Sequence, residues 1–416
     1  MLGSDDFLRR ARRHDTDFTR QRALPLNRLV PMLLNLRKGT VRDELDQFFE
    51  TLYEDNVPQN TVSQAAFCRA RQKLSPEALA LLNDVLVDTA ATHIAQRRWH
   101  GLRVLAVDGS TARLPDTPDI DQYFGRPTGS GVPLARFSRL YDVLNGLVIQ
   151  ADMEPYGTGE RELAAGYLLN LESDDLALYD RGYPAFWLFA FHHIEQRHYC
   201  ARVKHDFHPE VKAFLADGVK QRTVLLTPNR TSVRQCRDYH LPSDPLPVRL
   251  IRVELNNDEV EVLATSLLDE KAYPRRQFAK LYALRWGIEE NYKREKQRLE
   301  IENFSGRSAE VVRQDFHAKI FAQNLTAIIA TLAQWLADER YRHRKRAYRV
   351  NFANALSKMK NNLVRLLLHT SPLELCWRLL KRIAQSVEAV RPGRSYPRNL
   401  KKVRVPGFQP QYKRTR

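Results

Sequence analysis

The sequence is poor in cysteine, and its few cysteines lie far apart. A chain of 416 residues has only four, Cys68, Cys200, Cys236 and Cys376, and no C-x-x-C pair occurs. Structural zinc sites and disulfide frameworks need cysteines at short, paired spacings. The sequence therefore indicates neither kind of site, and it fits a reducing compartment.

The beginning of the chain lacks the apolar stretch of a secretory signal. Asp5, Asp6, Arg9 and Arg10 place four charges within the first ten residues, which is atypical of such a signal. Long uncharged runs are also scarce. One such run, residues 320–337, contains three amide side chains and lies between charged segments. It predicts a buried core helix and not a membrane span.

Acidic residues are too few to balance the basic ones. The 66 Lys and Arg outnumber the 49 Asp and Glu, which gives a net charge of +17. Residues 340–349 include six Lys or Arg and no acid, and residues 391–416 include nine and no acid. Basic blocks of this kind are typical of segments that follow a phosphate backbone. The balance of charge favours a polyanionic partner, with nucleic acid as the first candidate.

Residues 1–98 are predicted to be helical throughout, since apolar side chains recur there at helical spacing. Within them, residues 60–74 could form a short helix, a turn and a basic helix that carries Arg69, Arg71 and Lys73. This order resembles a helix-turn-helix, a motif that reads DNA. A plain structural role remains the alternative for this segment.

The pattern changes at residue 101, where alternating apolar residues rich in Val and Leu replace helical spacing. The expected elements are a strand ending at Asp108, a hairpin turning at Asn145-Gly146, a helix over 159–172, a strand ending at Asp180, a strand over 198–206 and β-like segments over 206–268. This order predicts a mixed α/β sheet with a β-rich insertion, followed by helices.

Three carboxylates could meet at one site. Asp108 and Asp180 are each expected where a strand ends, and Glu289 is expected on a later helix. Ligands collect at the carboxyl ends of strands in open α/β sheets, although aspartate also commonly begins turns. Three hard oxygen ligands suit a pair of Mg²⁺ ions ~3.5–4 Å apart. On a basic protein, such a set favours phosphoryl transfer on nucleic acid.

A predicted helix over residues 281–302 aligns Tyr282, Arg285, Glu289 and Lys296 on one face, within an arc of about 60°. A solvated helix with i,i+4 ion pairs is the alternative. Beside three carboxylates, Arg285 and Lys296 would hold phosphates, and Tyr282 would stack on a base or bond a phosphate.

The spacing Tyr282-x2-Arg285-x3-Glu289-x6-Lys296 matches the YREK signature of the DDE transposases of the insertion sequence four family. VDGSTARLPDT around Asp108 resembles that family's first aspartate motif. LYDRGYPAF around the second aspartate resembles the next one. The resemblance extends over nearly the whole chain.

The resemblance implies a ribonuclease H-like core in which Asp108, Asp180 and Glu289 hold two Mg²⁺ ions, with Mn²⁺ as a substitute. It implies cut-and-paste DNA transposition with a hairpin intermediate. The partners would be double-stranded DNA, as terminal inverted repeats and as target, and a second copy of the chain in the synaptic complex. The protein would act in the bacterial cytoplasm, on the nucleoid when DNA-bound, without a membrane.

Five segments are expected on this basis. They are a helical DNA-binding domain (1–98), the first part of the core (99–205), the β-rich insertion (206–270), the second part of the core with the YREK helix (271–338), and a basic helical region with its tail (339–416).

One departure concerns the hairpin step. Relatives use a tryptophan in or near the insertion to stack on a flipped base, and this sequence has none between 200 and 270. Phe207, Tyr239 and Trp286 are the open alternatives. Arg202 and Lys204 are further expected DNA contacts.

Two other functions remain open: a domesticated or decayed transposase that only binds DNA, and a stand-alone nuclease. Three intact carboxylates argue against the DNA-binding relic, because a protein that only binds DNA has no need of metal ligands.

Overall fold

The computed structural model describes residues 2–20, 22–35, 39–53, 62–255, 259–288, 301–360, 362–368 and 371–391. The chain forms two compact units. The helical unit comprises residues 1–93, 112–135 and 294–416, and the sheet unit comprises residues 94–111 and 136–293. The five segments expected from the sequence remain a prediction, because the units are defined by spatial contacts and not by order along the chain.

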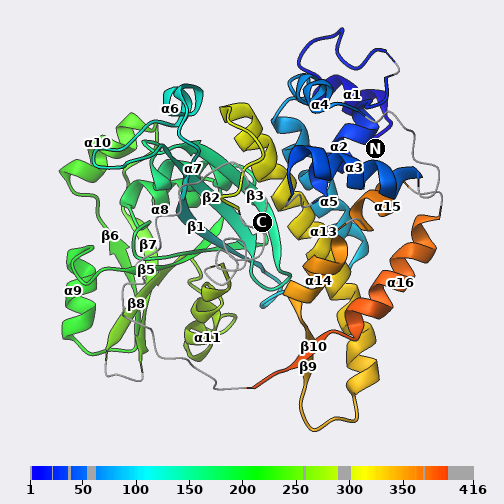
Figure 1. Cartoon of the computed structure of the whole chain (residues 1–416). Helices are drawn as coiled ribbons and strands as arrows, with labels where there is room; N and C mark the ends of the chain where they lie inside the picture. Colours follow the sequence, from blue (N-terminus) through cyan, green and yellow to red (C-terminus); the bar gives the residue numbers. More distant parts are fainter. Residues whose placement is uncertain are drawn as a thin grey trace. The chain divides into compact units, whose positions relative to one another are not determined.

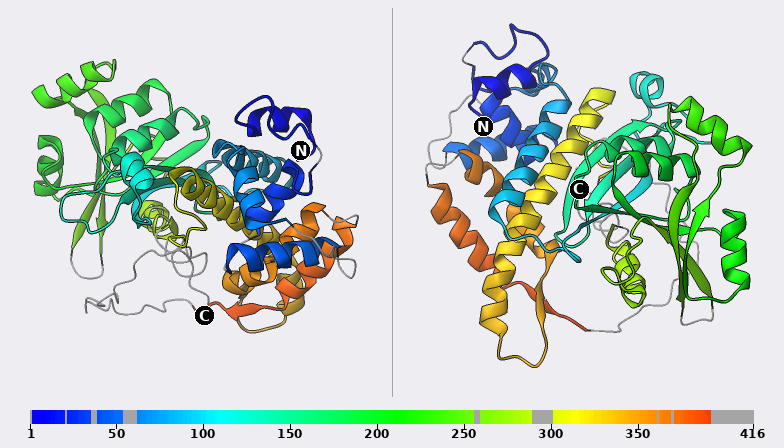
Figure 2. Two further views of the ribbon diagram at one scale, coloured as in Figure 1. Left: turned by 45° about the horizontal axis from the view of Figure 1, so that its top comes forward. Right: turned by 180° about the vertical axis from the view of Figure 1, so that it is seen from behind.

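The helical unit gathers segments from both ends of the chain around one long helix, α13 (Figure 1). Its elements are α1 (Asp5–Ala11), α2 (Leu26–Leu34), α3 (Val41–Tyr53), α4 (Gln64–Arg71), α5 (Glu77–His93), α6 (Pro118–Phe124), α13 (Ala309–Tyr341), α14 (Phe352–Met359), α15 (Asn362–Leu368) and α16 (Pro372–Ala384), with a small antiparallel pair of β9 (Tyr348–Val350) and β10 (Val387–Ala389). The early α2 and α5 and the late α14 and α16 all pack on α13 (Figure 2).

The predicted core helix over residues 320–337 is confirmed as part of α13. This helix is long and apolar enough to cross a membrane, yet 61% of its most apolar window is buried inside the protein. Phe316, Ile320, Ala322 and Ala333 are among its buried side chains. Burial against neighbouring helices explains its apolar composition.

The sheet unit is built on eight strands in the order β3-β2-β1-β4-β5-β8-β7-β6. The strands are β1 (Arg103–Arg113), β2 (Leu134–Asp142), β3 (Leu147–Pro155), β4 (Asp175–Tyr179), β5 (His198–Val203), β6 (Gln221–Leu226), β7 (Leu246–Glu254) and β8 (Val260–Thr265). The three central strands β1, β4 and β5 run parallel, whereas β6, β7 and β8 pair antiparallel. The sheet is therefore mixed, as the sequence predicts.

Four helices of this unit cover one face of the sheet: α7 (Glu160–Leu168), α8 (Phe186–Ile194), α9 (Pro209–Ala216) and α10 (Arg230–Asp238). Their apolar side chains share one core cluster with alternate strand residues such as Leu105, Val107 and Tyr179. The intervening strand residues, Ala106 and Leu178 among them, are buried but do not belong to that cluster. Because side chains alternate along a strand, these residues lie on the opposite face.

The opposite face carries η2 (Arg275–Gln277) and α11 (Phe278–Ala283). The guanidinium of Arg249 lies 5.4 Å from the ring centroid of Phe278, and the residues on either side of Arg249 in β7 belong to the helix-covered cluster. Helix α11 therefore packs on the side of the sheet away from α7 and α8.

Several local predictions are confirmed. The hairpin turns at Asn145-Gly146 between β2 and β3, with Gly146 at a φ of 75°, a conformation that favours glycine. The 159–172 segment contains α7, and β4 ends directly before Asp180.

Two predictions need correction. The strand predicted to end at Asp108 continues to Arg113. The insertion is not purely β-like, since it contains α9 and α10, and its strands extend the central sheet itself. Both helices are short and mostly exposed, so the apolar pattern of the adjacent strands dominates this part of the sequence.

Candidate active site

Asp108 and Asp180 come from neighbouring parallel strands. The register pairs Ala106 of β1 with Leu178 of β4. Continued by two residues, this register sets the two aspartates side by side. Adjacent strands are ~4.8 Å apart, and paired residues of parallel strands point to the same side. Both carboxylates therefore lie on the face that carries α11.

Arg202 continues this row on the third parallel strand. The register of β4 with β5 pairs Tyr179 with Ala201, so Asp180 stands beside Arg202. The Arg202 Nη1 atom lies 2.7 Å from Oε1 of Glu261 in β8, in a partly buried ion pair. A basic group is thus fixed directly beside the aspartate pair.

Backbone amides orient both aspartates. The Gly109 N–H donates to Oδ1 of Asp108 at 3.0 Å, and the Gly182 N–H donates to Oδ1 of Asp180 at 2.7 Å. Both side chains are half-buried. Each carboxylate also has a second oxygen, so the pair offers hard oxygen donors to a cation.

The helix-covered face of β1 carries a different acid. A Cβ placed on Gly109 would lie 3.3 Å from Cδ of Glu160 and 3.4 Å from the Tyr183 hydroxyl. Glu160 forms an ion pair with Arg136. Gly109 and Asp108 face opposite sides of β1, because side chains alternate along a strand. Glu160 therefore lies close to Gly109 but on the face of the sheet opposite the aspartates.

Tyr282 and Arg285, two expected DNA contacts, are both buried, and their role toward DNA stays a prediction. They are 6% and 7% exposed. The Tyr282 hydroxyl donates to the carbonyl of Tyr179 at 3.2 Å, and the Arg285 guanidinium lies 5.2 Å from the Trp286 ring centroid. Burial raises the pKa of the Tyr282 hydroxyl, and the negative charge of Asp180 adds to the rise. Tyr282 thus ties α11 to the strand that precedes Asp180.

The predicted continuous helix over residues 281–302 is also interrupted. Helix α11 ends at Ala283, and Leu284 and Arg285 form a turn before residues 286–288 resume helical structure. Gly287 has ordinary space around it, because an added Cβ would meet only Val143, at 3.9 Å.

The remaining two YREK positions, Glu289 and Lys296, lie outside the described residues. Among the residues that are described, no three His, Cys, Asp or Glu side chains gather as a metal-binding group. Asp108 and Asp180 are the two members of the expected carboxylate set that the structure describes.

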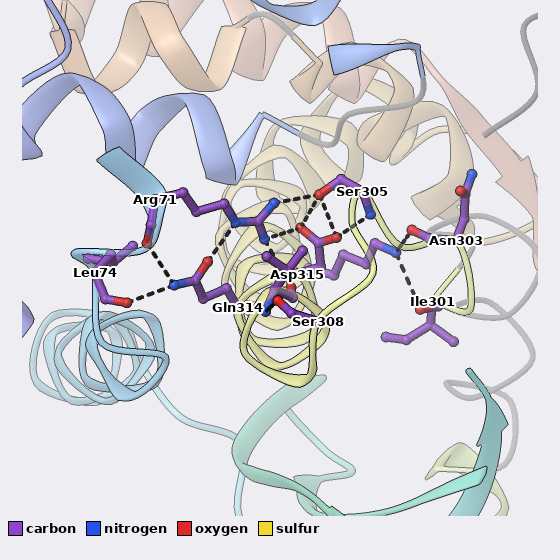
Figure 3. A network of polar contacts seen from close by, with 10 residues as sticks. Arg71, Leu74, Ile301, Asn303, Ser305, Ser308, Gln314 and Asp315 are labelled. Atoms are coloured by element: carbon purple, nitrogen blue, oxygen red, sulfur yellow. Dashed lines mark hydrogen bonds and ion pairs between the residues drawn. The ribbon is translucent and has the colours of Figure 1, made fainter. Parts of the chain in front are cut away.

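Arg71, an expected DNA contact, is instead a structural residue of the helical unit (Figure 3). It is 2% exposed. Its guanidinium donates to Oδ1 of Asp315 at 2.7 Å, to Oε1 of Gln314 at 2.6 Å and to the Ser305 hydroxyl at 2.6 Å. Gln314 in turn donates to the carbonyls of Arg71 and Leu74 at the end of α4. Such a satisfied buried network fastens α4 to α13.

The neighbouring basic residues differ from Arg71. Arg69 is exposed, and Lys73 lies 3.4 Å from a carboxylate oxygen of Asp17. In the sheet unit Lys204 is exposed. These three side chains stay available as DNA contacts, and the structure leaves their role a prediction.

Sequence reasoning missed Glu261. It lies 59 positions beyond Arg202 in a strand that reads only as alternating, so no local motif marks it. The antiparallel pairing of Arg202 with Leu263 brings β8 alongside, and this pairing is visible only in the folded sheet.

The family of the chain follows from its similarity to known proteins. Residues 99–325 match the family model described as Transposase DDE domain, over more than half of the chain. Transposase InsG for insertion sequence element IS4, from Escherichia coli (strain K12), is 27% identical over 316 residues, 74% of this chain and 70% of that protein. Putative transposase InsZ, from the same organism, is 27% identical over 128 residues, 29% of this chain and 43% of its own length.

A solved structure, the cryo-EM structure of a piggyBac transposase synaptic complex with hairpin DNA, covers 95% of this chain and 85% of its own. Its identity of 11% and TM-score of 0.44 are too low to support an argument. The family assignment therefore rests on the family model and on the two sequence relatives. The chain belongs to the transposase DDE domain family, and it is a DNA transposase of the IS4 kind, an enzyme that cleaves DNA and transfers strands with the help of divalent metal ions.

Proposed function

We propose that Asp108, Asp180 and Glu289 form the catalytic centre of a ribonuclease H-like core that performs cut-and-paste transposition of an insertion sequence. The register of β1 and β4, which sets the two aspartates side by side on one face of a mixed sheet, carries this proposal. Two adjacent carboxylates would repel each other unless a cation lies between them. The arrangement is suited to metal binding.

The position of α11 supports Glu289 as the third ligand. Helix α11 packs on the aspartate face, and the Tyr282 hydroxyl holds it to the carbonyl that precedes Asp180. Glu289 follows Ile288, which is fully buried, by one residue. The chain therefore leaves the described region close to this face, with Glu289 as its next side chain.

The donor set fits Mg²⁺, with Mn²⁺ as a substitute, since both accept carboxylate oxygens. When bound, two such ions would activate the attacking oxygen and stabilise the leaving oxygen. The contribution of the protein is to fix the ligands. The amides of Gly109 and Gly182 hold one oxygen of each aspartate in place.

Arg202 would hold a phosphate beside the reacting one. Its ion pair with Glu261 fixes the guanidinium in the same row as the aspartates, and a guanidinium offers several donors to phosphate oxygens. Lys296 would hold another phosphate beside the reacting one, and Lys204, Arg69 and Lys73 would contact the DNA backbone.

The reaction consists of successive in-line phosphoryl transfers at this one site. Water cleaves one strand at each element end and frees a 3′-OH, which attacks the opposite strand and closes a hairpin. Hydrolysis of the hairpin frees the 3′-OH again, and this hydroxyl attacks target DNA. Trp286 is the best-placed aromatic for a flipped base, because it is 46% exposed and follows α11 on the aspartate side.

The other two aromatic alternatives are less suitable. Tyr239 lies against Trp187 on the helix-covered side, with the rings tilted by 33°, and donates to Glu162, and Phe207 packs on Phe189 in the same layer.

The substrates would be the terminal inverted repeats and a target duplex. A homodimer would bring two ends together, and the work would take place in the bacterial cytoplasm, on the nucleoid. The basic balance of the chain, +17, supports a DNA partner.

The test is cleavage of linear DNA that carries the sequences flanking the gene, with Mg²⁺ or with EDTA. Wild type should cut at the repeat boundary only with metal and yield strand-transfer products, whereas Glu289→Gln should bind without cutting. Binding without cutting by both proteins would indicate a DNA-binding relic. Cutting by wild type without strand transfer would indicate a stand-alone nuclease.

A further inference from the structure

Helix α10, within the insertion, presents three arginines on one face. Arg230, Arg234 and Arg237 stand at offsets 0, 4 and 7, which fall within an arc of about 60°. All three are exposed. The stripe runs about 10.5 Å along the helix at ~1.5 Å per residue.

The opposite face of α10 fastens it to the sheet unit. Cys236 is fully buried, and the Tyr239 ring lies 4.5 Å from the Trp187 ring at the start of α8. Asn229 caps the first turn by accepting from the Ser232 N–H at 2.8 Å. The arginines are thus displayed on a fixed helix with a defined outward face.

Nothing among the described residues neutralises this stripe. None of the three arginines forms an ion pair within the described part of the chain, and the helix carries one acid, Asp238, outside the arc. Like charges at i,i+3 and i,i+4 destabilise a helix by ~0.2–0.5 kcal/mol a pair. The one acid at such a spacing, Asp238 four residues after Arg234, forms no ion pair with it in the described structure, so the stripe is suited to an external anion.

Contacts through α7 connect α10 to the part of β1 that carries Asp108, on the helix-covered face and thus across the sheet from the aspartates. The Tyr239 hydroxyl, just beyond α10, donates to Oε1 of Glu162 at 3.1 Å, in the first turn of α7. The same turn begins with Glu160, whose carboxyl carbon would lie 3.3 Å from a Cβ on Gly109, the neighbour of Asp108. Helix α10 packs on α8, which in turn packs on α7 (Figures 1 and 2).

We propose that the arginine stripe of α10 is a binding track for the phosphate backbone of the DNA that enters the active site. The proposal rests on the proposed function and adds a DNA surface outside the YREK helix. At a rise of 3.4 Å per nucleotide along one strand, the stripe matches about three phosphates. Guanidinium groups bind phosphate through paired donors, and backbone contacts of this kind position DNA without reading its sequence.

The test compares DNA affinity at 50 to 300 mM salt for four proteins, in EDTA so that no cutting occurs. The variants are R230Q/R234Q/R237Q, the charge-retaining R230K/R234K/R237K, and K212Q/K220Q/K271Q. The last removes equal charge at exposed positions of the same unit. The probe is a labelled linear duplex that carries the sequences flanking the gene, and circular dichroism checks folding.

Each phosphate contact contributes ~0.9 to the slope of log affinity against log salt. The glutamine triple should therefore flatten the slope by up to about 2.7, the lysine triple should restore most of it, and the control should change it far less. Equal slopes for the glutamine triple and the control would overturn the proposal.

Cleavage of the same duplex by wild type with Mg²⁺ distinguishes a failure of the arginine track from a failure of the proposed function. If wild type binds and cuts while the glutamine triple keeps the wild-type slope, only the arginine track is wrong. If wild type neither binds nor cuts, the proposed function fails, and the track fails with it.

Discussion

Asp108 and Asp180 occupy matched positions on two neighbouring parallel strands, each two residues beyond the paired Ala106 and Leu178. Arg202 extends the row to the third parallel strand. The sheet therefore places two acids and one base in line across three strands, on the face that α11 covers. The geometry of the parallel ladder, and not any local motif, creates this row.

The pair formed by Arg202 and Glu261 should affect DNA positioning more than folding. Arg202→Gln removes a phosphate donor, and we expect cleavage to fall by about 10²-fold, in line with the loss of one charge-stabilising donor. Glu261→Gln leaves the arginine present but less fixed, so a smaller loss is expected. The measurement is single-turnover cleavage of pre-bound DNA.

Arg202→Lys provides the control for this prediction. It retains the charge and should recover part of the rate. Equal activity of Arg202→Gln and wild type would exclude a role in the reaction.

The buried network around Arg71 should determine the stability of the helical unit. Arg71→Met leaves Asp315 buried without its main partner, and loss of one member of a buried ion pair costs ~3–5 kcal/mol. Urea unfolding should show this loss in the free energy of unfolding. The exposed Arg69→Met is the matched control and should change stability by less than about 0.5 kcal/mol. Similar effects of both substitutions would contradict the structural role of Arg71.

His192 should make stability fall as the pH is lowered. Complete burial lowers its pKa from 6.5 to about 3. The neutral ring accepts from the Tyr179 hydroxyl at 2.9 Å and donates to the Arg197 carbonyl at 3.2 Å. Between these two pKa values the unfolded chain binds a proton that the folded chain does not. The contribution of the neutral His192 ring to the free energy of unfolding is therefore fully present above pH 6.5. Below that pH it decreases by ~1.4 kcal/mol per pH unit for one proton.

The check is the free energy of unfolding from pH 7 to pH 4.5 for wild type and His192→Gln. For the variant, the slope of the free energy of unfolding against pH should be smaller by up to the amount that one proton contributes. His193→Gln, an exposed neighbour on the same helix, should keep the wild-type slope. An unchanged slope in His192→Gln would show that another group causes the dependence.

Tyr282 should act within the fold. Tyr282→Phe removes the hydrogen bond to the Tyr179 carbonyl, which should cost ~1 kcal/mol of stability. The salt dependence of DNA binding should not change, because the hydroxyl points into the protein. A flatter salt dependence with unchanged stability would restore Tyr282 as a DNA contact.

Local signals in the sequence predict much of the fold. The hairpin at Asn145-Gly146 is predictable because Gly146 adopts a φ of 75°, which glycine tolerates, and the apolar run inside α13 has enough length to identify a core helix. The end of β4 directly before Asp180 follows from a short apolar run that stops at a polar turn.

Features that depend on distant residues are not predictable in this way. Arg71 lies 244 residues from Asp315, and its basic, amphipathic surroundings are the same as those of an exposed DNA contact. Helix α10 buries one residue, Cys236, so it shows little apolar periodicity. The turn at Leu284 and Arg285 interrupts a segment whose composition is helical throughout.

The most direct measurement is metal-dependent DNA cleavage by wild type, Asp108→Asn, Asp180→Asn and Glu160→Gln. The first three test the aspartate pair, and the last removes an acid on the other side of the same strand. Wild type should cut only with a divalent ion. Each asparagine variant should bind DNA normally and cut at least about 10³-fold more slowly, while Glu160→Gln should retain most of the activity. Normal cutting by either asparagine variant, or an equal loss in Glu160→Gln, would contradict the assignment of the aspartate pair as the catalytic centre.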